Sequence, residues 1–245
     1  TFITRKEIEK RIVELGFPES KLTKFDERKP GFFASLTKGR DEYFNYAQLA
    51  ILEAAEKKNV VIIGRGAFAV FENVPNHIAV RLIADEKTRI SRLRNEFNWD
   101  EKKALQRIQE SDENRAGYHR SFYNVDINDA SLYHAVLNTE KISLDNCAKI
   151  ISDIVETKVT VKQEEDGNLM IEQLLKAQSI VNKLYFEERV NIDFMHATIE
   201  GNTIYLHGVS DSPVVVESAL HVIRSQMPEY EAKSAVSIIH DFKTY

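Results

Sequence analysis

The chain has 245 residues, of which 43% are hydrophobic and 29% charged, and its 33 basic and 38 acidic residues give a formal net charge of -5. This composition is typical of a globular protein, and the length accommodates one large domain or two modest ones. The single cysteine, Cys147, has no intrachain disulfide partner, and the seven histidines show no zinc-ligand spacing. We therefore expect neither redox nor structural-zinc chemistry.

The apolar runs are far shorter than the roughly 18 residues that a membrane-spanning helix needs. The first residues, Thr1 to Arg5, do not resemble a signal peptide, and we expect a cytoplasmic protein. Residues 1–156 carry 25 basic and 25 acidic side chains, whereas residues 157–245 carry 8 and 13. The acidic C-terminal third disfavours binding to nucleic acid or to anionic lipid.

Helical and strand signals alternate through the first 157 residues. The predicted elements are helices over 6–15 and 41–58, strands over 60–63 and 77–84, helices over 85–97 and 102–115, a strand over 133–137 and a helix over 143–156. The β-branched run Val60 to Ile63 predicts a strand buried on both faces. Asp85 and Ser143 are predicted caps, and Asn98 with Glu101 has capping-box spacing. This alternation predicts an α/β fold, with a parallel sheet and helices on both of its faces.

The pattern changes after Lys158. The charged stretch from Lys162 to Gly167 predicts a linker or hairpin, and a helix over 169–188 follows. Two strands flank the turn Glu200 to Asn202, Pro213 opens a helix to Gln226, and residues 232–242 alternate as a last strand. The predicted order is helix, strand, strand, helix, strand, which is typical of a small α+β domain.

The sharpest chemical feature is Gly64-Arg65-Gly66, at the carboxyl end of the predicted strand 60–63. Open α/β sheets bind ligands at such strand ends, and an arginine between glycines suits a phosphate. The alternative is a tight turn whose arginine pairs with a structural carboxylate. The segment is not the Gly-x4-Gly-Lys-Ser/Thr phosphate loop.

A second candidate lies on the predicted helix that contains Arg107, Asp112 and Arg115. Arg107 and Arg115 are about two helical turns apart, so both cations can share a face, with Asp112 holding Arg115 in place. Two cations on one mobile helix suit closure over a triphosphate. The alternative is an ordinary solvated helix face within a run of basic residues.

Together these features resemble the cytidylate kinase-like family of P-loop nucleoside monophosphate kinases. The resemblance includes the strand and Gly-Arg-Gly segment, the strand that ends at Asp85, Asp112 with Arg115, and Leu137 to Thr139 before the Ser143 helix. It implies a kinase-like domain over 1–157, with ATP and Mg2+ as cofactors and a nucleotide as substrate.

The resemblance also implies roles for single residues. Arg65, with Gly64 and Gly66, would hold the acceptor nucleotide. Arg107 and Arg115 would neutralise the transferring phosphoryl group, and Asp112 would orient them. The acceptor-site candidates outside these two segments are Asp26, Arg28 and Asn138, and the charged segment around Asp26 also fits a surface turn.

Three departures from the family pattern matter. Gly66 and Asn138 stand where cytidylate kinases have aspartate, which puts cytosine recognition in question. The family's first strand and phosphate loop would precede a segment such as Phe2 to Lys6. Either that loop lies upstream of Thr1, or the protein is a relative without it.

Residues 165–245 resemble a BON-type module in the order of their elements and in the stretch Thr203 to Val209. The resemblance implies binding to a protein partner or homodimer formation. Two functions remain: an ATP-dependent nucleotide kinase, or a non-catalytic nucleotide- or phosphate-sensing protein with a C-terminal interaction module. Both require the guanidinium groups of Arg65, Arg107 and Arg115 to meet at one phosphate.

Overall fold

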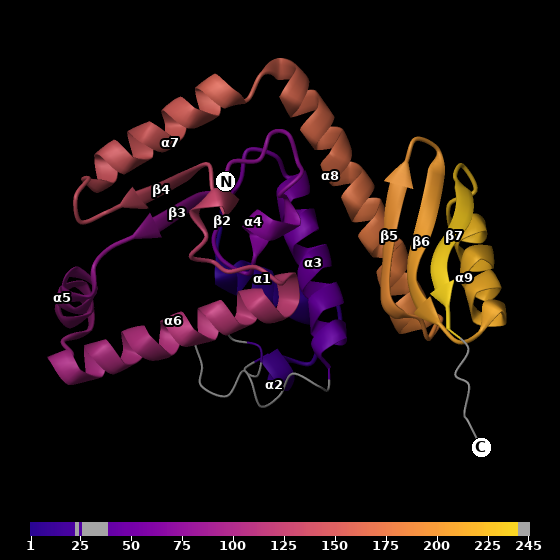
Figure 1. Ribbon diagram of the computed structural model, residues 1–245, viewed down its shortest axis with the longest axis horizontal. Coiled ribbons are helices and arrows are strands. Elements are labelled where there is room, and N and C mark those ends of the chain that lie inside the picture. Colours follow the sequence, from indigo (N-terminus) through magenta and orange to yellow (C-terminus); the bar gives the residue numbers. More distant parts are fainter. Residues whose placement is uncertain (23–24, 26–38, 240–245) are drawn as a thin grey trace.

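The molecule consists of an N-terminal unit and a C-terminal unit joined by one long helix (Figure 1). It is a computed structural model that describes residues 1–22, 25 and 39–239. The N-terminal unit mixes helices with two small parallel sheets, and the C-terminal unit is a three-stranded sheet with helices on one face.

The helices of the N-terminal unit surround its short strands. In the described residues they are α1 (Arg5–Glu14), α2 (Glu19–Leu22), α3 (Arg40–Glu56), α4 (Ala67–Val70), α5 (Glu86–Phe97), α6 (Glu101–Tyr123), the 3-10 turn η3 (Ala130–Leu132) and α7 (Leu144–Lys158). Asp85 and Ser143 cap α5 and α7 as predicted, because each side chain accepts a hydrogen bond from a backbone N–H three residues on.

The strands of this unit form two parallel pairs. β1 (Phe2–Ile3) pairs with β2 (Val61–Ile62), and β3 (Val80–Ile83) pairs with β4 (Ala135–Asn138). One parallel sheet was predicted for the strands from residue 60 onward; the parallel pairing of β3 with β4 is found, but β2 pairs with β1 in a separate sheet. Strand β1 was not predicted, and it enters α1 through a single residue, Thr4.

The prediction that strand 60–63 is buried on both faces is wrong. Val60 and Ile62 pack against the main core, whereas Val61 and Ile63 are 59% and 49% exposed. The core lies on the side of α1 and α3, where Ile3 and Ile51 are buried. The opposite side of this short pair is open to solvent, so side chains alternate between core and solvent.

Two local predictions also need correction. Asp100, not Asn98, caps α6, and Asn98 instead ends α5 with a left-handed backbone, φ 53°. Helix α6 also continues to Tyr123, beyond the predicted end at Arg115, because its last turns pack their aromatic side chains into the core.

The charged stretch from Lys162 to Gly167 is helical and not a linker. It belongs to α8 (Val161–Asn182), whose first turn is fixed by a capping box between Thr160 and Gln163. Gly167 is buried against Asn76, and a Cβ there would lie 2.0 Å from the Asn76 Oδ1 atom. The close approach of the helix to this loop explains why a glycine lies within it.

Helix α8 belongs to both cores. Met170 and Leu174 pack against the N-terminal core, and Ile180 is buried in the C-terminal one. Between them, Gln178 donates hydrogen bonds to Asn45 on α3 and to Asn182, at 3.2 and 2.7 Å. These buried amides tie α8 to α3 where the two units meet.

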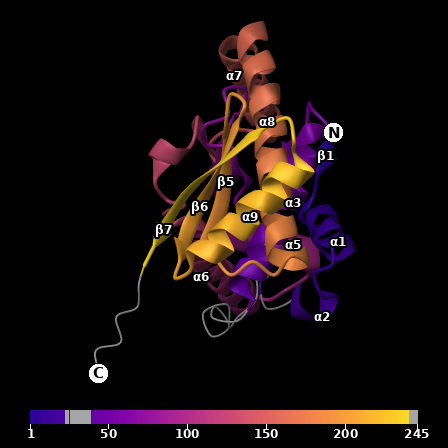
Figure 2. The ribbon, with the colours of Figure 1, turned by 90° about the vertical axis from the view of Figure 1, so that its right-hand side faces the viewer.

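The C-terminal unit has the predicted element order. After α8 come the π-helical turn η4 (Lys183–Glu187), β5 (Asp193–Glu200), β6 (Thr203–Ser210), α9 (Pro213–Gln226) and β7 (Glu231–Ile238). Strand β6 pairs antiparallel with β5 and parallel with β7. Helix α9 lies across one face of this sheet (Figure 2). Its apolar side chains, with the end of α8, form the second core.

Candidate functional site

The predicted phosphate-binding turn lies where β2 ends. Gly64, Arg65 and Gly66 all have left-handed backbones, with φ of 78°, 57° and 73°. Three such residues in succession reverse the chain tightly, which explains the two glycines. A Cβ on Gly66 would lie 2.1 Å from the Tyr123 ring, and the Tyr123 hydroxyl donates to the Arg65 carbonyl at 2.9 Å. The end of α6 therefore holds this turn in place.

The Arg65 side chain turns inward and is 1% exposed. Its guanidinium donates to the Phe25 carbonyl at 2.8 Å and to the Tyr43 hydroxyl at 3.0 Å, and it forms an ion pair with Glu9. The group also lies over the Tyr118 ring, 5.9 Å from its centroid. Arg65 therefore lies in a tight turn and pairs with a carboxylate of the protein itself, which is the alternative to phosphate binding given above.

A second cationic group lies where α5 packs on α6. Arg89 donates to both carboxylate oxygens of Asp112 at 2.7 Å, and Arg115 donates to the same carboxylate at 3.1 Å and to Ser111 at 3.2 Å. We call Arg89, Asp112 and Arg115 the lid cluster. Partial burial opposes ionisation of Asp112, yet the hydrogen bonds and charge of Arg89, and then of Arg115, hold its pKa below the ordinary value.

The lid cluster has a net positive charge, because it contains two arginines and one aspartate, and its side chains are partly exposed to solvent. Its side chains are 32%, 43% and 36% exposed for Arg89, Asp112 and Arg115. Each guanidinium has five N–H donors, and the bonds to Asp112 and Ser111 use only some of them. The cluster can therefore accept a phosphate without first breaking its internal ion pairs.

The structure does not bring the three predicted arginines to one partner. Arg107 lies 3.8 Å from Glu110, and along the helix it is about 12 Å from Arg115. Arg65 pairs with Glu9, and Arg115 pairs with Asp112. Arg89, which the sequence analysis did not single out, joins the cluster because α5 packs on α6, a contact that the spacing of residues does not reveal.

Of the three other predicted site residues, Asn138 lies in the described part of the chain. Asn138, at the end of β4, accepts a hydrogen bond from the Glu140 N–H at 3.0 Å. Next to it, Arg92 donates to the Thr139 hydroxyl and carbonyl at 2.9 and 2.8 Å, which ties α5 to the end of β4. Asp26 and Arg28 lie outside the described residues.

A capping box lies at the junction of β1 and α1. The Thr4 hydroxyl accepts from the Glu7 N–H at 3.3 Å, and the Glu7 carboxylate accepts from the Thr4 N–H at 2.7 Å. The bond from the Thr4 backbone is the main cause that lowers the pKa of the Glu7 carboxyl. This cap fixes the first turn of α1.

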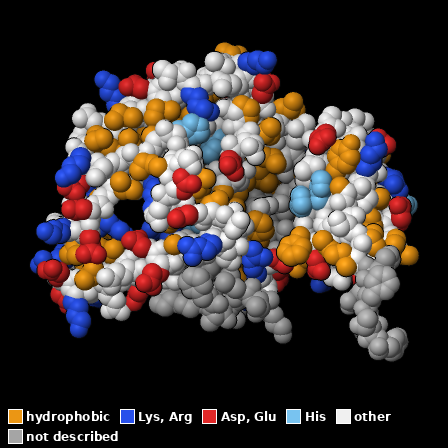
Figure 3. Space-filling model, viewed as in Figure 1, with side chains coloured by type: hydrophobic (Ala, Val, Ile, Leu, Met, Phe, Trp, Pro, Cys, Tyr) orange, Lys and Arg blue, Asp and Glu red, His pale blue; other side chains and the backbone are white. Residues whose placement is uncertain are grey.

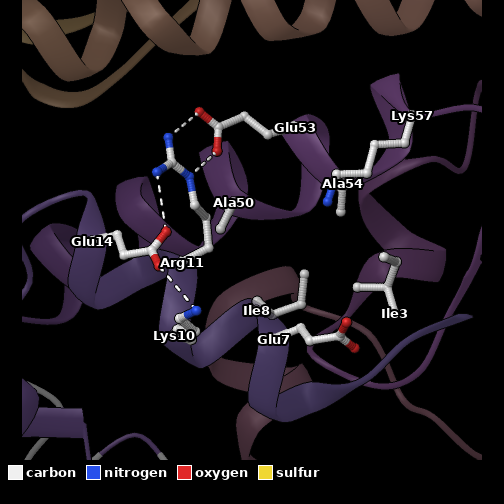
Figure 4. Close-up of a pocket in the computed structure, with 10 residues that line it drawn as sticks. All are labelled: Ile3, Glu7, Ile8, Lys10, Arg11, Glu14, Ala50, Glu53, Ala54 and Lys57. Atoms are coloured by element: carbon white, nitrogen blue, oxygen red, sulfur yellow. Dashed lines mark hydrogen bonds and ion pairs between the residues drawn. The ribbon is translucent and has the colours of Figure 1, made fainter.

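Two hollows are visible in the described structure. Figure 3 shows an opening between α6 and the strands β3 and β4, with acidic and basic side chains at its rim. A pocket of about 240 Å³ lies between α1 and α3, beside Ile3 and Glu7 (Figure 4). There Arg11 donates to both oxygens of Glu53 at 2.6 and 2.9 Å, so the charges of the pocket neutralise each other.

No group of three or more His, Cys, Asp or Glu side chains suited to a metal ion occurs within residues 1–22, 25 and 39–239. Over the same ranges, none of the helices has both the length and the apolar character needed to cross a bilayer.

Known proteins are similar to the N-terminal unit. The model of the cytidylate kinase-like family matches residues 1–141. A cytidylate kinase of Methanocaldococcus jannaschii is 26% identical over 126 residues, which cover 51% of this chain and 69% of that protein. A cytidylate kinase of Staphylothermus marinus is 30% identical over 104 residues, or 42% of this chain and 58% of that protein. The match therefore spans little more than half of the second relative.

A crystal structure of an uncharacterized protein from Eubacterium ventriosum has a similar fold. The superposed region covers 64% of this chain and 83% of the chain in that structure, with a TM-score of 0.50 and 21% sequence identity. This likeness supports an α/β fold for the matched part of the chain.

Proposed function

Because the chain belongs to the cytidylate kinase-like family, we propose that it binds a nucleoside monophosphate at the lid cluster. Two roles fit such binding: an ATP- and Mg2+-dependent nucleotide kinase, or a nucleotide-sensing protein that does not transfer the phosphoryl group. The observation that carries the proposal is the lid cluster, in which Arg89 and Arg115 share the Asp112 carboxylate.

Phosphoryl transfer depends on positioning and neutralising the β and γ phosphates. The inward-facing Arg65 is committed to Glu9, Tyr43 and the Phe25 carbonyl, so its part in this proposal is to shape the turn.

The lid cluster supports binding of a phosphate monoester. Arg89 and Arg115 come from two helices and share the Asp112 carboxylate, which fixes their planes before any ligand arrives. Arg92 holds α5 to the end of β4, and Asn138 lies at the same strand end. In this proposal Arg115 and Arg89 bind the phosphate and Asp112 orients both. It replaces the expected meeting of Arg65, Arg107 and Arg115 at one phosphate, because these three side chains pair with Glu9, Glu110 and Asp112.

Calorimetric titration of the full chain with CMP, CDP and ATP, each with and without Mg2+, tests the proposal. We expect CMP to bind, and Arg115→Ala to weaken its binding about tenfold, the loss of one charge-assisted contact. Arg120→Ala, an exposed position on the same helix, is the matched control and should change the Kd less than twofold.

Phosphorus NMR of the same protein with ATP, Mg2+ and CMP measures transfer directly. Conversion of CMP to CDP that Arg115→Ala abolishes would establish the kinase role. Absence of CMP binding would overturn the nucleotide-binding proposal altogether.

The proposal divides the chain into a kinase-like domain over 1–157 and a BON-like domain over 165–245. The order β5, β6, α9 and β7 supports this division, whereas α8 starts at Val161, before the boundary at 165, and packs on both cores. We assign self-association to the BON-like domain, through the Phe194 side chain, which is 79% exposed. Sedimentation velocity should show a dimer that Phe194→Ser weakens, and a monomer at all concentrations would contradict the assignment.

A further inference from the structure

The C-terminal sheet has one face that no helix covers in the described residues. Its other face packs on α8 and α9 through Ile204 and Leu206 of β6. Because side chains alternate along a strand, the neighbouring positions of β5 and β6 point to the open side. These include His196, Thr198 and His207. Figure 3 shows histidine side chains together on the part of the C-terminal unit that faces the viewer.

His196 and His207 are direct cross-strand partners in the antiparallel register of β5 and β6. Their rings are stacked, with centroids 4.6 Å apart and planes 6° from parallel. Side chains at directly opposed positions have Cβ atoms about 5 Å apart. The backbone therefore holds the two imidazoles next to each other. Rotation of the two side chains alone would turn one nitrogen of each ring towards a common point.

The hydrogen bonds of the pair leave ring nitrogens available as ligands. The His196 Nδ1 atom lies 3.0 Å from the Phe194 carbonyl, which accepts only, so Nδ1 carries the proton and Nε2 has the free lone pair. Metal-binding histidines usually make this contact, in which the second N–H is donated to a backbone carbonyl. The His207 Nε2 atom lies 2.9 Å from the Thr198 hydroxyl, a neutral group that can rotate away.

The backbone beside the pair is strained. Phe194 has φ 54°, a left-handed value that is costly for an aromatic residue, and the register of β5 shifts between Asp193 and His196. Bulges re-aim neighbouring side chains and frequently lie next to binding sites. Here the irregular backbone directs the Phe194 carbonyl at His196.

We propose that His196 and His207 chelate one divalent transition-metal ion of the zinc, nickel or copper class. Imidazole nitrogen is a preferred ligand of these ions, and a shared ion at about 2.1 Å from each nitrogen requires the nitrogens to lie within about 4 Å of each other. Water or an external group fills the other coordination positions, so the site is a surface chelate and not a closed structural site.

A second histidine pair in the molecule lacks these features. His77 and His134 have ring centroids 5.9 Å apart and nearly perpendicular planes, and the His134 Nδ1 atom accepts the Ala79 N–H at 3.0 Å. Burial lowers the pKa of His77 to about 4, and the nearby Lys158 opposes a further positive charge. That pair therefore serves as an internal comparison for a site that should not bind metal.

Calorimetric titration of the tag-free full chain with NiCl2 tests the proposal. We expect one ion per chain, and His196→Asn and His207→Asn should each weaken binding at least tenfold because a chelate becomes a single ligand. His221→Asn, an exposed histidine on α9, is the matched control and should change the Kd less than twofold. Circular dichroism melting checks that every variant is folded.

Nuclear magnetic resonance supplies a readout at the level of single residues. Substoichiometric Cu2+ should broaden the ring signals of His196 and His207 before those of the other histidines. Equal broadening of all exposed histidines, or equal affinity in the three variants, would overturn the proposal.

Discussion

The two units of the molecule build their sheets differently. In the C-terminal unit, β5, β6 and β7 span eight residues each and alternate between a core face and an open face. In the N-terminal unit the strands span two to four residues in separate parallel pairs, and Phe2, Val61 and Leu82 are more than half exposed.

This difference shows where stability resides in each unit. The C-terminal sheet is held by long hydrogen-bonded ladders, whereas the N-terminal unit depends on helix packing and on a few buried polar contacts. Arg65, with Glu9 and Tyr43, is the most buried of these contacts. Substitutions that remove N-terminal contacts should therefore cost more than matched substitutions on the C-terminal sheet.

Arg65→Met should give the largest effect. It removes the buried guanidinium that pairs with Glu9 and donates to the Tyr43 hydroxyl, and we expect the free energy of unfolding to fall by about 4 kcal/mol. Urea denaturation measures this loss. Lys233→Met, at an exposed ion pair on β7, is the C-terminal counterpart and should change stability by less than about 0.5 kcal/mol. Similar values for the two variants would remove the contrast between the units.

Gly66→Ala compares directly with Gly201→Ala, because both glycines have left-handed backbones. The added Cβ at Gly66 would meet the Tyr123 ring at 2.1 Å, whereas at Gly201 nothing lies within 4 Å. We expect a loss of about 3 kcal/mol for Gly66→Ala and about 1 kcal/mol for Gly201→Ala. Thermal and urea unfolding of both variants give the difference, and equal losses would show that Tyr123 does not hold the turn.

The pH dependence of stability should come partly from His77. Burial, and then the neighbouring His134 and Lys158, lower its pKa to about 4 from the ordinary 6.5. Between these values the unfolded chain binds a proton that the folded chain does not, so the free energy of unfolding falls as the pH falls. We expect a loss of about 2 kcal/mol between pH 6.5 and 4, allowing for the partial exposure of the ring.

His77→Gln should flatten this dependence, because glutamine does not titrate. Urea unfolding at pH 7, 6, 5 and 4 measures the slope, with the exposed His221→Gln on α9 as the control. If the free energy of unfolding of His77→Gln depends on pH as steeply as that of the unsubstituted protein, another group takes up the proton.

Thr4→Ala should give the smallest effect. It removes the side-chain half of the capping box at the start of α1, and we expect a loss of about 1 kcal/mol. Thermal unfolding measures this loss, and a variant as stable as the unsubstituted protein would show that the cap does not hold the start of α1.

Features that depend on neighbours in sequence could be predicted. The caps Asp85 and Ser143, the turn at Glu200 to Asn202 and the helix from Pro213 need only residues within a few positions, and all are found in the structure. The C-terminal strands could be predicted because burial on one face imposes a period of two on the sequence.

Features that depend on distant residues could not be predicted. Glu9 and Arg65 are 56 positions apart, and Arg89 and Asp112 are 23 apart, so no spacing rule connects them. The glycine at position 167 reflects the close approach of α8 to Asn76, 91 positions away, whereas the helical state of Lys162 to Gly167 has a local signal, the capping box of Thr160 and Gln163, that the sequence analysis missed.

The amino-acid sequence alone determined the alternation of helices and strands, the parallel pairing of β3 with β4 and the likeness to a nucleotide kinase family. Tertiary structure decided which charges meet: Arg65 faces the core, Arg89 and Arg115 share Asp112, and Glu7 occupies the start of α1. The physical reason is that backbone periodicity and capping act over a few residues, whereas the partner of a charged side chain depends on which distant segments the packed core brings within hydrogen-bonding distance.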